Sequence, residues 1–183
     1  MNRYVALLRG INVSGQKPIK MADLKRMFEE MGFARVQTYI QSGNVLFEAE
    51  GEAETIRREI ERGIEESFGF EVTVVLRTTA DMERVVRSCP FPADALKEGE
   101  SLYVSLLADT PSPQAIDKLP GYSDDIDEYR IAGRDVYILC RKGFGQSKFS
   151  NSFLERKLGV AATNRNWQTM TKLVALGRAM ENG

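Results

Sequence analysis

The chain contains no histidine, the residue that most often serves as general base in enzymes and as ligand to zinc. Ser-His-Asp, Cys-His and HExxH mechanisms are therefore excluded. It has two cysteines, Cys89 and Cys140, which lie far apart in the sequence and belong to no CxxC pair. This usage is typical of reduced thiols in the cytoplasm rather than of a disulfide framework.

Long apolar runs are also missing. The longest, at residues 72–76 and 103–108, have the length of a strand. The N-terminus has no basic-then-apolar secretory pattern. We therefore expect a cytoplasmic protein with no membrane partner.

The chain does have the composition of a folded protein. Of its 183 residues, 43% are hydrophobic and 28% are charged, which is ordinary for a globular protein. This length can bury a sizeable core and can form one domain or two small ones.

Hydrophobic periodicity predicts a regular order of elements in the first 77 residues. The expected elements are a strand at 4–8, a helix around 24–31, strands at 35–40 and 44–48, a helix at 52–68 and a strand at 71–77. The glycine-containing segment 41–43 is typical of a hairpin between the two middle strands. The order βαββαβ is that of a ferredoxin-like unit.

The same order recurs in the second half of the chain. A helix capped by Thr78 or Thr79 is stopped by Pro90, and the loop 91–100 is the expected boundary. The expected elements beyond it are strands at 102–107, 126–131 and 136–140, a short helix after Pro113, a helix at 147–158, a segment at 160–163 and a closing helix. We predict an α+β fold of two ferredoxin-like subdomains with antiparallel sheets plus extra helices, divided as residues 1–90 and 91–183.

Positive charge is concentrated near the two ends of the chain, although the formal net charge is −1. Residues 1–20 carry four basic side chains and no acid, and residues 141–180 carry eight basic side chains and one acid, Glu155. This segregation favours a localised positive field and an anionic partner. The alternative is that helices expose basic faces by chance.

The segment 143–148, Gly-Phe-Gly-Gln-Ser-Lys, lies between a predicted strand and a predicted helix. Backbone N–H groups and the positive end of a helix dipole favour a phosphate or carboxylate at such a place, and Lys148 would supply the opposite charge. The segment matches neither GxxxxGK[ST] nor GxGxxG. Its glycines can equally form a plain turn, with Ser147 as the N-cap.

The segment 9–17 is a second glycine-bearing loop, between the first strand and the first helix. Gly10 and Gly15 allow close approach of a ligand to the backbone. An ordinary connection with solvated Lys17 and Lys20 is the competing interpretation.

Polar side chains also gather at the predicted hairpin and before the closing helix. Hairpin turns favour serine, glycine and asparagine for local reasons, Asn166 can be a helix cap, and Trp167 can belong to the core. The acidic run 124–128 lacks EF-hand spacing, so we expect a solvated turn and no metal site. The candidate ligand-binding residues are Arg9, Asn12, Lys20, Tyr39, Gln41, Ser42, Asn44, Lys148, Asn151, Arg165, Asn166 and Trp167.

Three long motifs carry a resemblance to a known family: LLRGINVSGQKPIKMADL, TYIQSGNVLF and SKFSNSFLERKLGVAATNRNW. The chain resembles the bacterial family called domain of unknown function number 1697 over nearly its whole length. That family has glycine, arginine and asparagine where Ser14, Gln146 and Gln168 stand here. If the arginine helps to hold an anion, Gln146 weakens the site. The resemblance implies two ferredoxin-like subdomains and implies no activity or cofactor.

Three functions remain open. The first is binding of a small anionic ligand, phosphorylated or nucleotide-like, between the two subdomains. Arg9, Lys20, Lys148 and Arg165 would hold the anion, and Tyr39, Ser42 and Asn44 would orient the rest of the ligand. The second is nucleic-acid binding by a basic face, with steep salt dependence. The third is a protein interaction module without a pocket.

The expected topology complicates a single site. With the first and third strands of each subdomain taken as parallel, the loop after Leu8 and the turn before Asn44 should lie at opposite ends of the sheet. The same reasoning separates Lys148 from Arg165. A single site would then require the two subdomains to bring different ends together.

Overall fold

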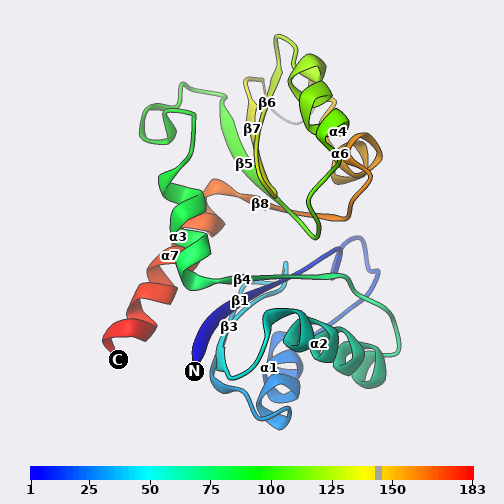
Figure 1. The fold of residues 1–183 in the computed structure, drawn as a ribbon, viewed down its shortest axis with the longest axis vertical. Coiled ribbons are helices and arrows are strands. Elements are labelled where there is room, and N and C mark those ends of the chain that lie inside the picture. The colour runs from blue at the N-terminus through cyan, green and yellow to red at the C-terminus, as the bar shows by residue number, and fades with distance from the viewer. Residues whose placement is uncertain (143–145) are drawn as a thin grey trace. The chain divides into compact units, whose positions relative to one another are not determined.

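A computed structural model of the chain describes residues 1–142 and 146–183 (Figure 1). Its elements, in chain order, are β1 (Asn2–Leu8), α1 (Met21–Glu30), β2 (Ala34–Tyr39), β3 (Asn44–Ala49), α2 (Ala53–Phe68), β4 (Val74–Thr78), α3 (Thr79–Arg87), η1 (Ala93–Ala95), β5 (Ser101–Leu107), α4 (Pro113–Lys118), η2 (Leu119–Tyr122), β6 (Asp127–Ala132), β7 (Asp135–Cys140), α6 (Asn151–Leu158), β8 (Ala162–Asn166) and α7 (Trp167–Asn182). The predicted order of elements and the α+β class are confirmed.

The chain groups into two compact units. The first comprises Met1–Glu83 and Lys172–Gly183, and the second comprises Arg84–Thr171. Both α3 and α7 therefore contribute residues to each unit. The division into subdomains 1–90 and 91–183 stays a prediction.

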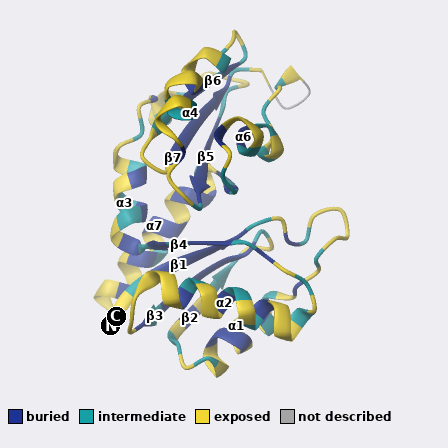
Figure 2. Ribbon diagram, turned by 45° about the vertical axis from the view of Figure 1, so that its right-hand side comes forward, coloured by how far each residue is buried: buried dark blue, intermediate teal, exposed yellow. Residues whose placement is uncertain are grey.

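The first unit is built on a four-stranded antiparallel sheet in the order β2-β3-β1-β4. Helices α1 and α2 cover one face of it (Figure 1). In α2, Ile56, Ile60 and Ile64 recur every four residues and are buried, whereas none of the residues between them is buried (Figure 2). The helix ends at Gly69, whose φ of 82° suits glycine at this position. Burial of this apolar stripe against the sheet explains why α2 forms here.

The second unit repeats the plan with a sheet in the order β6-β7-β5-β8. One core cluster combines the sheet with α6 through Tyr129, Ile138, Leu154 and Leu158. Helix α6 begins at Asn151, because Ser150 accepts the N–H of Phe153 at 3.0 Å. The prediction that this helix starts at residue 147 was therefore wrong by four residues, and Ser147 is not its cap.

Strand direction corrects the expected geometry of the first unit. β3 is antiparallel to β1, and Asn44 lies opposite Leu7. The loop after β1 and the hairpin before β3 therefore lie at the same end of the sheet. The expectation of opposite ends was wrong, because the β2–β3 hairpin reverses the chain and places β3 beside β1 in the antiparallel sense.

The same correction holds in the second unit. β7 and β8 are both antiparallel to β5, so they run in the same direction, and Cys140 and Asn166 lie toward one end of the sheet. Strand direction thus does not separate Lys148, which follows β7, from Arg165 in β8. In the part of the chain that the structure describes, no helix is long and apolar enough to cross a membrane.

Candidate functional site

Two loops of the first unit are joined through the side chain of Asn12. Its Nδ2 donates to the carbonyl oxygens of Ile19 and Gln41 at 3.0 and 2.9 Å, and its Oδ1 accepts the N–H of Ile19 at 2.8 Å. One amide thus holds the β1–α1 loop closed and connects it to the β2–β3 hairpin. Asn12 has a φ of 55°, a conformation that asparagine tolerates better than most residues.

Close packing reinforces this connection at Gly43. The N–H of Leu8 donates to the carbonyl of Gly43 at 2.9 Å. A Cβ at Gly43 would lie 2.7 Å from Ile11 Cδ1 and 2.9 Å from Leu8 Cβ. The hairpin can approach β1 this closely because residue 43 has no side chain.

Unfavourable backbone conformations are concentrated in the same two loops. Of the five non-glycine residues with positive φ in the described chain, Asn12, Ser14, Lys17 and Ile40 lie there. Such conformations cost about 1–3 kcal/mol each and persist where the surrounding contacts impose them. They therefore mark this end of the sheet as the candidate site.

A hollow of about 450 Å³ opens beside the N-terminus of α1, and we call it the α1 hollow. Its lining residues are Asn12, Pro18, Ile19, Lys20, Met21, Asp23, Gln41 and Phe68. Lys20 occupies the N-cap of α1 and makes no side-chain cap hydrogen bond. The first N–H groups of a helix have no intrahelical acceptor, and here a cation stands where a capping oxygen is usual. The N-terminus of α1 therefore offers positive charge and backbone donors together.

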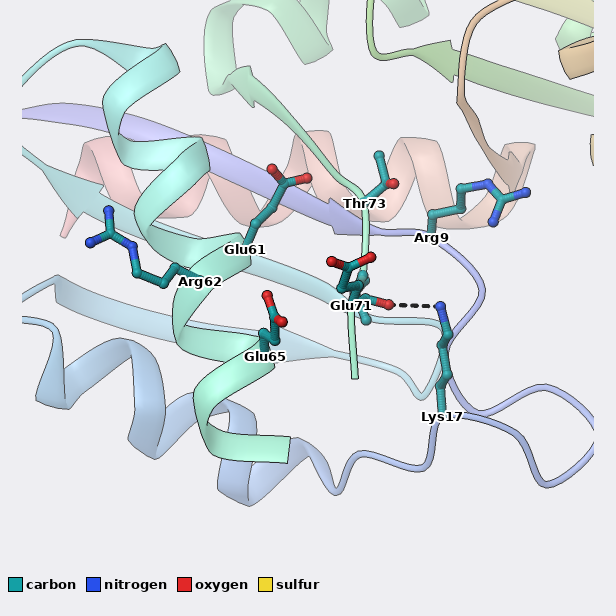
Figure 3. Close-up of a pocket in the computed structure, with 8 residues that line it drawn as sticks. Arg9, Lys17, Glu61, Arg62, Glu65, Glu71 and Thr73 are labelled. Carbon is teal, nitrogen blue, oxygen red and sulfur yellow. Dashed lines mark hydrogen bonds between the residues drawn. The ribbon is translucent and has the colours of Figure 1, made fainter. Parts of the chain in front are cut away.

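A second hollow of about 420 Å³ lies between the β1–α1 loop, α2 and residues 71–73, and we call it the α2 hollow (Figure 3). It is lined by Arg9, Lys17, Glu61, Arg62, Glu65, Glu71, Val72 and Thr73. Lys17 Nζ donates to the carbonyl oxygen of Glu71 at 2.7 Å. Arg9 and Lys20, both predicted to hold one anion, thus line different hollows.

The hairpin residues are largely engaged with one another. Asn44 is fully buried, and its Nδ2 donates to the carbonyl of Tyr39 at 2.9 Å and to Ser42 Oγ at 3.0 Å. Tyr39 and Ser42 are half-buried, and Gln41 is exposed. These contacts support a local structural role for Asn44, whereas Gln41 lines the α1 hollow.

The first three residues of the predicted anion loop 143–148, residues 143–145, lie outside the described residues. Its last two residues bind a carboxylate of the protein itself. Asp127, which is 1% exposed, accepts the Ser147 hydroxyl at 2.8 Å and the Lys148 N–H at 2.9 Å. Sequence reasoning missed Asp127, because it read the residue only as part of an acidic turn. The turn itself is present: Asp124 accepts the N–H groups of Ile126 and Asp127, which hold the pKa of Asp124 below its usual range.

The remaining predicted residues lie in the second unit and serve several structural roles. Asn166 Oδ1 accepts the N–H of Thr169 at 2.8 Å, so Asn166 caps α7. Arg165 is buried, and burial lowers its pKa to about 10. Asn151 Nδ2 donates to the carbonyl of Ala162 at 2.7 Å. Trp167 lines a separate hollow of about 360 Å³ that also contains Cys89.

Several basic side chains near the chain ends are paired with carboxylates. Arg178 lies 2.8 Å from Glu83, and Arg141 lies 2.6 Å from Glu128. These pairs reduce the positive field that the charge count alone suggests. Arg141 and Arg130 together hold the pKa of Glu128 below its usual range.

The two thiols should react slowly with disulfide reagents. Burial raises the pKa of Cys89 and of Cys140, which lowers the fraction of reactive thiolate at neutral pH. We expect labelling by Ellman's reagent at pH 7 to be about tenfold slower than that of free cysteine. In guanidinium, where the protein is unfolded, both thiols should react with Ellman's reagent as fast as free cysteine. Labelling of Cys89 in the folded protein as fast as free cysteine would contradict this environment.

The fold is that of an α+β protein of two four-stranded antiparallel units, with a cluster of polar loops at one end of the first sheet. A family model described as a protein of unknown function, DUF1697, matches residues 1–137, and the chain belongs to this family. The expected family is thus confirmed, although the third motif lies beyond the matched residues. No curated protein matches the sequence.

Among solved structures, the chain is similar to a conserved bacterial protein, SP0830 from Streptococcus pneumoniae. The TM-score is 0.73 at 19% sequence identity, and the alignment covers 96% of this chain and 98% of that protein. At this sequence identity the similarity shows a shared fold and nothing more.

Proposed function

We propose that this protein binds a small anionic ligand, phosphorylated or nucleotide-like, in the α1 hollow of its first unit. One observation carries the proposal. Asn12, Lys20 and Gln41, predicted as ligand-binding residues in two separate loops, line one hollow at the N-terminus of a helix. The hydrogen bond between Asn12 and the Gln41 carbonyl keeps the two loops together before any ligand arrives.

The chemistry of the lining suits an anion with an organic remainder. The Lys20 ammonium and the first N–H groups of α1 would hold the anion, because the helix dipole is positive at this end. The carboxylate in the lining, Asp23, lies 3.4 Å from Arg26, which offsets its charge. Met21 and Phe68 give an apolar wall for the rest of the ligand. A volume of about 450 Å³ falls in the range of small-molecule sites.

The lining supports binding more directly than catalysis. Among the described residues that line the hollow there is no serine, cysteine or histidine to act as a nucleophile or a base near neutral pH. If a reaction takes place here, the contribution of this chain would be charge stabilisation of a transferring group by Lys20.

The proposal is tested by a thermal-shift screen of inorganic phosphate, nucleotides and short oligonucleotides at two salt concentrations. We expect stabilisation by one small phosphorylated compound, with little change between the salt concentrations. Loss of one charged contact commonly costs 1.5–3 kcal/mol, so Lys20→Ala should weaken binding roughly 10- to 100-fold. Lys25→Ala removes an exposed charge of the same helix, outside the hollow lining, and should leave binding unchanged.

Two outcomes would contradict the proposal. Stabilisation by any oligonucleotide, falling steeply as salt rises, would favour the nucleic-acid alternative. Equal weakening by Lys20→Ala and Lys25→Ala would show that the effect comes from general charge and not from the α1 hollow.

A further inference from the structure

We propose that the α2 hollow is a second binding site and that it takes a small zwitterion. The anionic group of the ligand would contact Lys17, and its ammonium group would contact Glu65 and Glu71. This site is separate from the α1 hollow and has its own lining residues.

The α2 hollow is held open by contacts between segments that are distant in sequence. Lys17, with a positive φ of 47°, reaches from the β1–α1 loop to the carbonyl of Glu71. The N–H of Arg9 donates to the carbonyl of Thr73 at 3.0 Å. On the opposite wall, Glu61 Oε2 accepts the N–H of Val74 at 2.9 Å and attaches α2 to the start of β4. These contacts join the β1–α1 loop, residues 71–74 and α2 around the hollow.

Cationic groups occupy the loop side of the α2 hollow. Lys17 is half-buried and uses one N–H of its ammonium on the Glu71 carbonyl, and an ammonium has three. The Arg9 side chain extends from the end of β1 on the same side (Figure 3). An anionic group of a ligand would therefore bind beside Lys17.

Carboxylates occupy the facing side. Glu61 is already engaged, because its other oxygen pairs with Arg57. Glu65 and Glu71 differ: both are exposed, and neither carboxylate forms an ion pair or a hydrogen bond within the part of the chain that the structure describes. Both line the hollow, and Figure 3 shows the Glu65 carboxylate between α2 and residues 71–73. They are the groups available to a ligand ammonium.

The equal numbers of positive and negative side chains in the lining favour a ligand that carries both charges. The lining contains three cationic and three carboxylate side chains. A simple anion beside Lys17 would also meet Glu65 and Glu71, and a simple cation between these carboxylates would also meet Lys17. Within the described residues there is no group of three or more acidic, cysteine or histidine side chains placed to hold a metal ion. A molecule with both charges satisfies both sides.

The test compares three probes by two-dimensional amide NMR: O-phosphoethanolamine, inorganic phosphate and ethylamine. We expect O-phosphoethanolamine to bind at least tenfold more tightly than either of the others, with shifts at Lys17, Glu71 and Val72. The double variant Glu65→Gln with Glu71→Gln should remove this advantage. Glu66→Gln changes an exposed neighbour on α2 that does not line the hollow, and it should keep the advantage.

Other results would overturn the proposal. Equal affinity for O-phosphoethanolamine and phosphate would exclude an ammonium subsite, as would an equal effect of Glu66→Gln and the double variant. Lys20→Ala separates the two sites: it should weaken binding in the α1 hollow and leave the shifts at Lys17 and Glu71 intact. Thermal unfolding of each variant verifies that a lost response is not lost folding.

Discussion

Replacing Gly43 by alanine is expected to lower the free energy of unfolding by about 3 kcal/mol, the sum of two costs. One is the positive φ of 89°, which an L side chain rarely adopts. The other is steric, because the new Cβ would lie 2.7 Å from Ile11 Cδ1 and 2.9 Å from Leu8 Cβ. For a chain of this length, the melting temperature should fall by about 6–12 °C.

Gly32→Ala is the matched control for this prediction. Gly32 has a φ of 90°, and a Cβ there would meet nothing within 4 Å. It should therefore show the backbone cost alone, about 1 kcal/mol. Urea unfolding of both variants measures the difference. If the two variants lose equal stability, the hairpin does not pack on β1 as closely as the structure indicates.

Replacing Asn12 by alanine should cost a similar amount, about 3 kcal/mol, since three hydrogen bonds contribute roughly 1 kcal/mol each. Alanine is also disfavoured at the φ of 55° found at this position. The β1–α1 loop and the hairpin should then separate. Amide hydrogen exchange should accelerate at Ile19 and leave the second unit unaffected.

Asn12→Gly and Asn12→Asp separate two contributions to the effect of Asn12→Ala: the backbone cost of the positive φ and the loss of the side-chain hydrogen bonds. Glycine accepts the positive φ and loses all three hydrogen bonds, so Asn12→Gly should lose slightly less stability than Asn12→Ala. Aspartate keeps the acceptor for the Ile19 N–H and loses both donors. Its second carboxylate oxygen would face the carbonyl oxygens of Ile19 and Gln41, so at neutral pH Asn12→Asp should be at least as destabilising as Asn12→Gly. An unchanged exchange rate at Ile19 in all three variants would contradict the role of Asn12 as the connection between the loops.

Much of the fold could be predicted from the sequence, because hydrophobic residues recur at regular spacing along its helices and strands. The stripe Ile56, Ile60 and Ile64 indicated α2, and it is buried as expected. The end of α3 before Pro90 was also predictable, because proline cannot continue a helix. The start of α6 was not, because Ser147 and Ser150 are equally good caps in sequence, and Asp127 engages the first of them.

The candidate site was only partly predictable, since it depends on contacts between distant segments. The polar loop residues were recognised, yet their arrangement was not, because the direction of β3 relative to β1 was taken wrongly. Asn12 was selected as a ligand-binding residue, and the structure shows it bonded to Ile19 and Gln41. The donors at Ser147 and Lys148 were expected to meet an external anion, and Asp127 supplies an internal one. Such partners, about 20 residues away, have no local sequence signal.

The central claim is that an anion binds at the N-terminus of α1. The most direct test is an amide NMR titration with the phosphorylated compound that gives the largest thermal shift. We predict saturable shifts at Asn12, Met21, Ala22 and Gln41. Their midpoint should move to roughly 10- to 100-fold higher ligand concentration in Lys20→Ala and stay unchanged in Lys25→Ala. Absence of saturable shifts at these amides, or shifts that persist unchanged in Lys20→Ala, would contradict it.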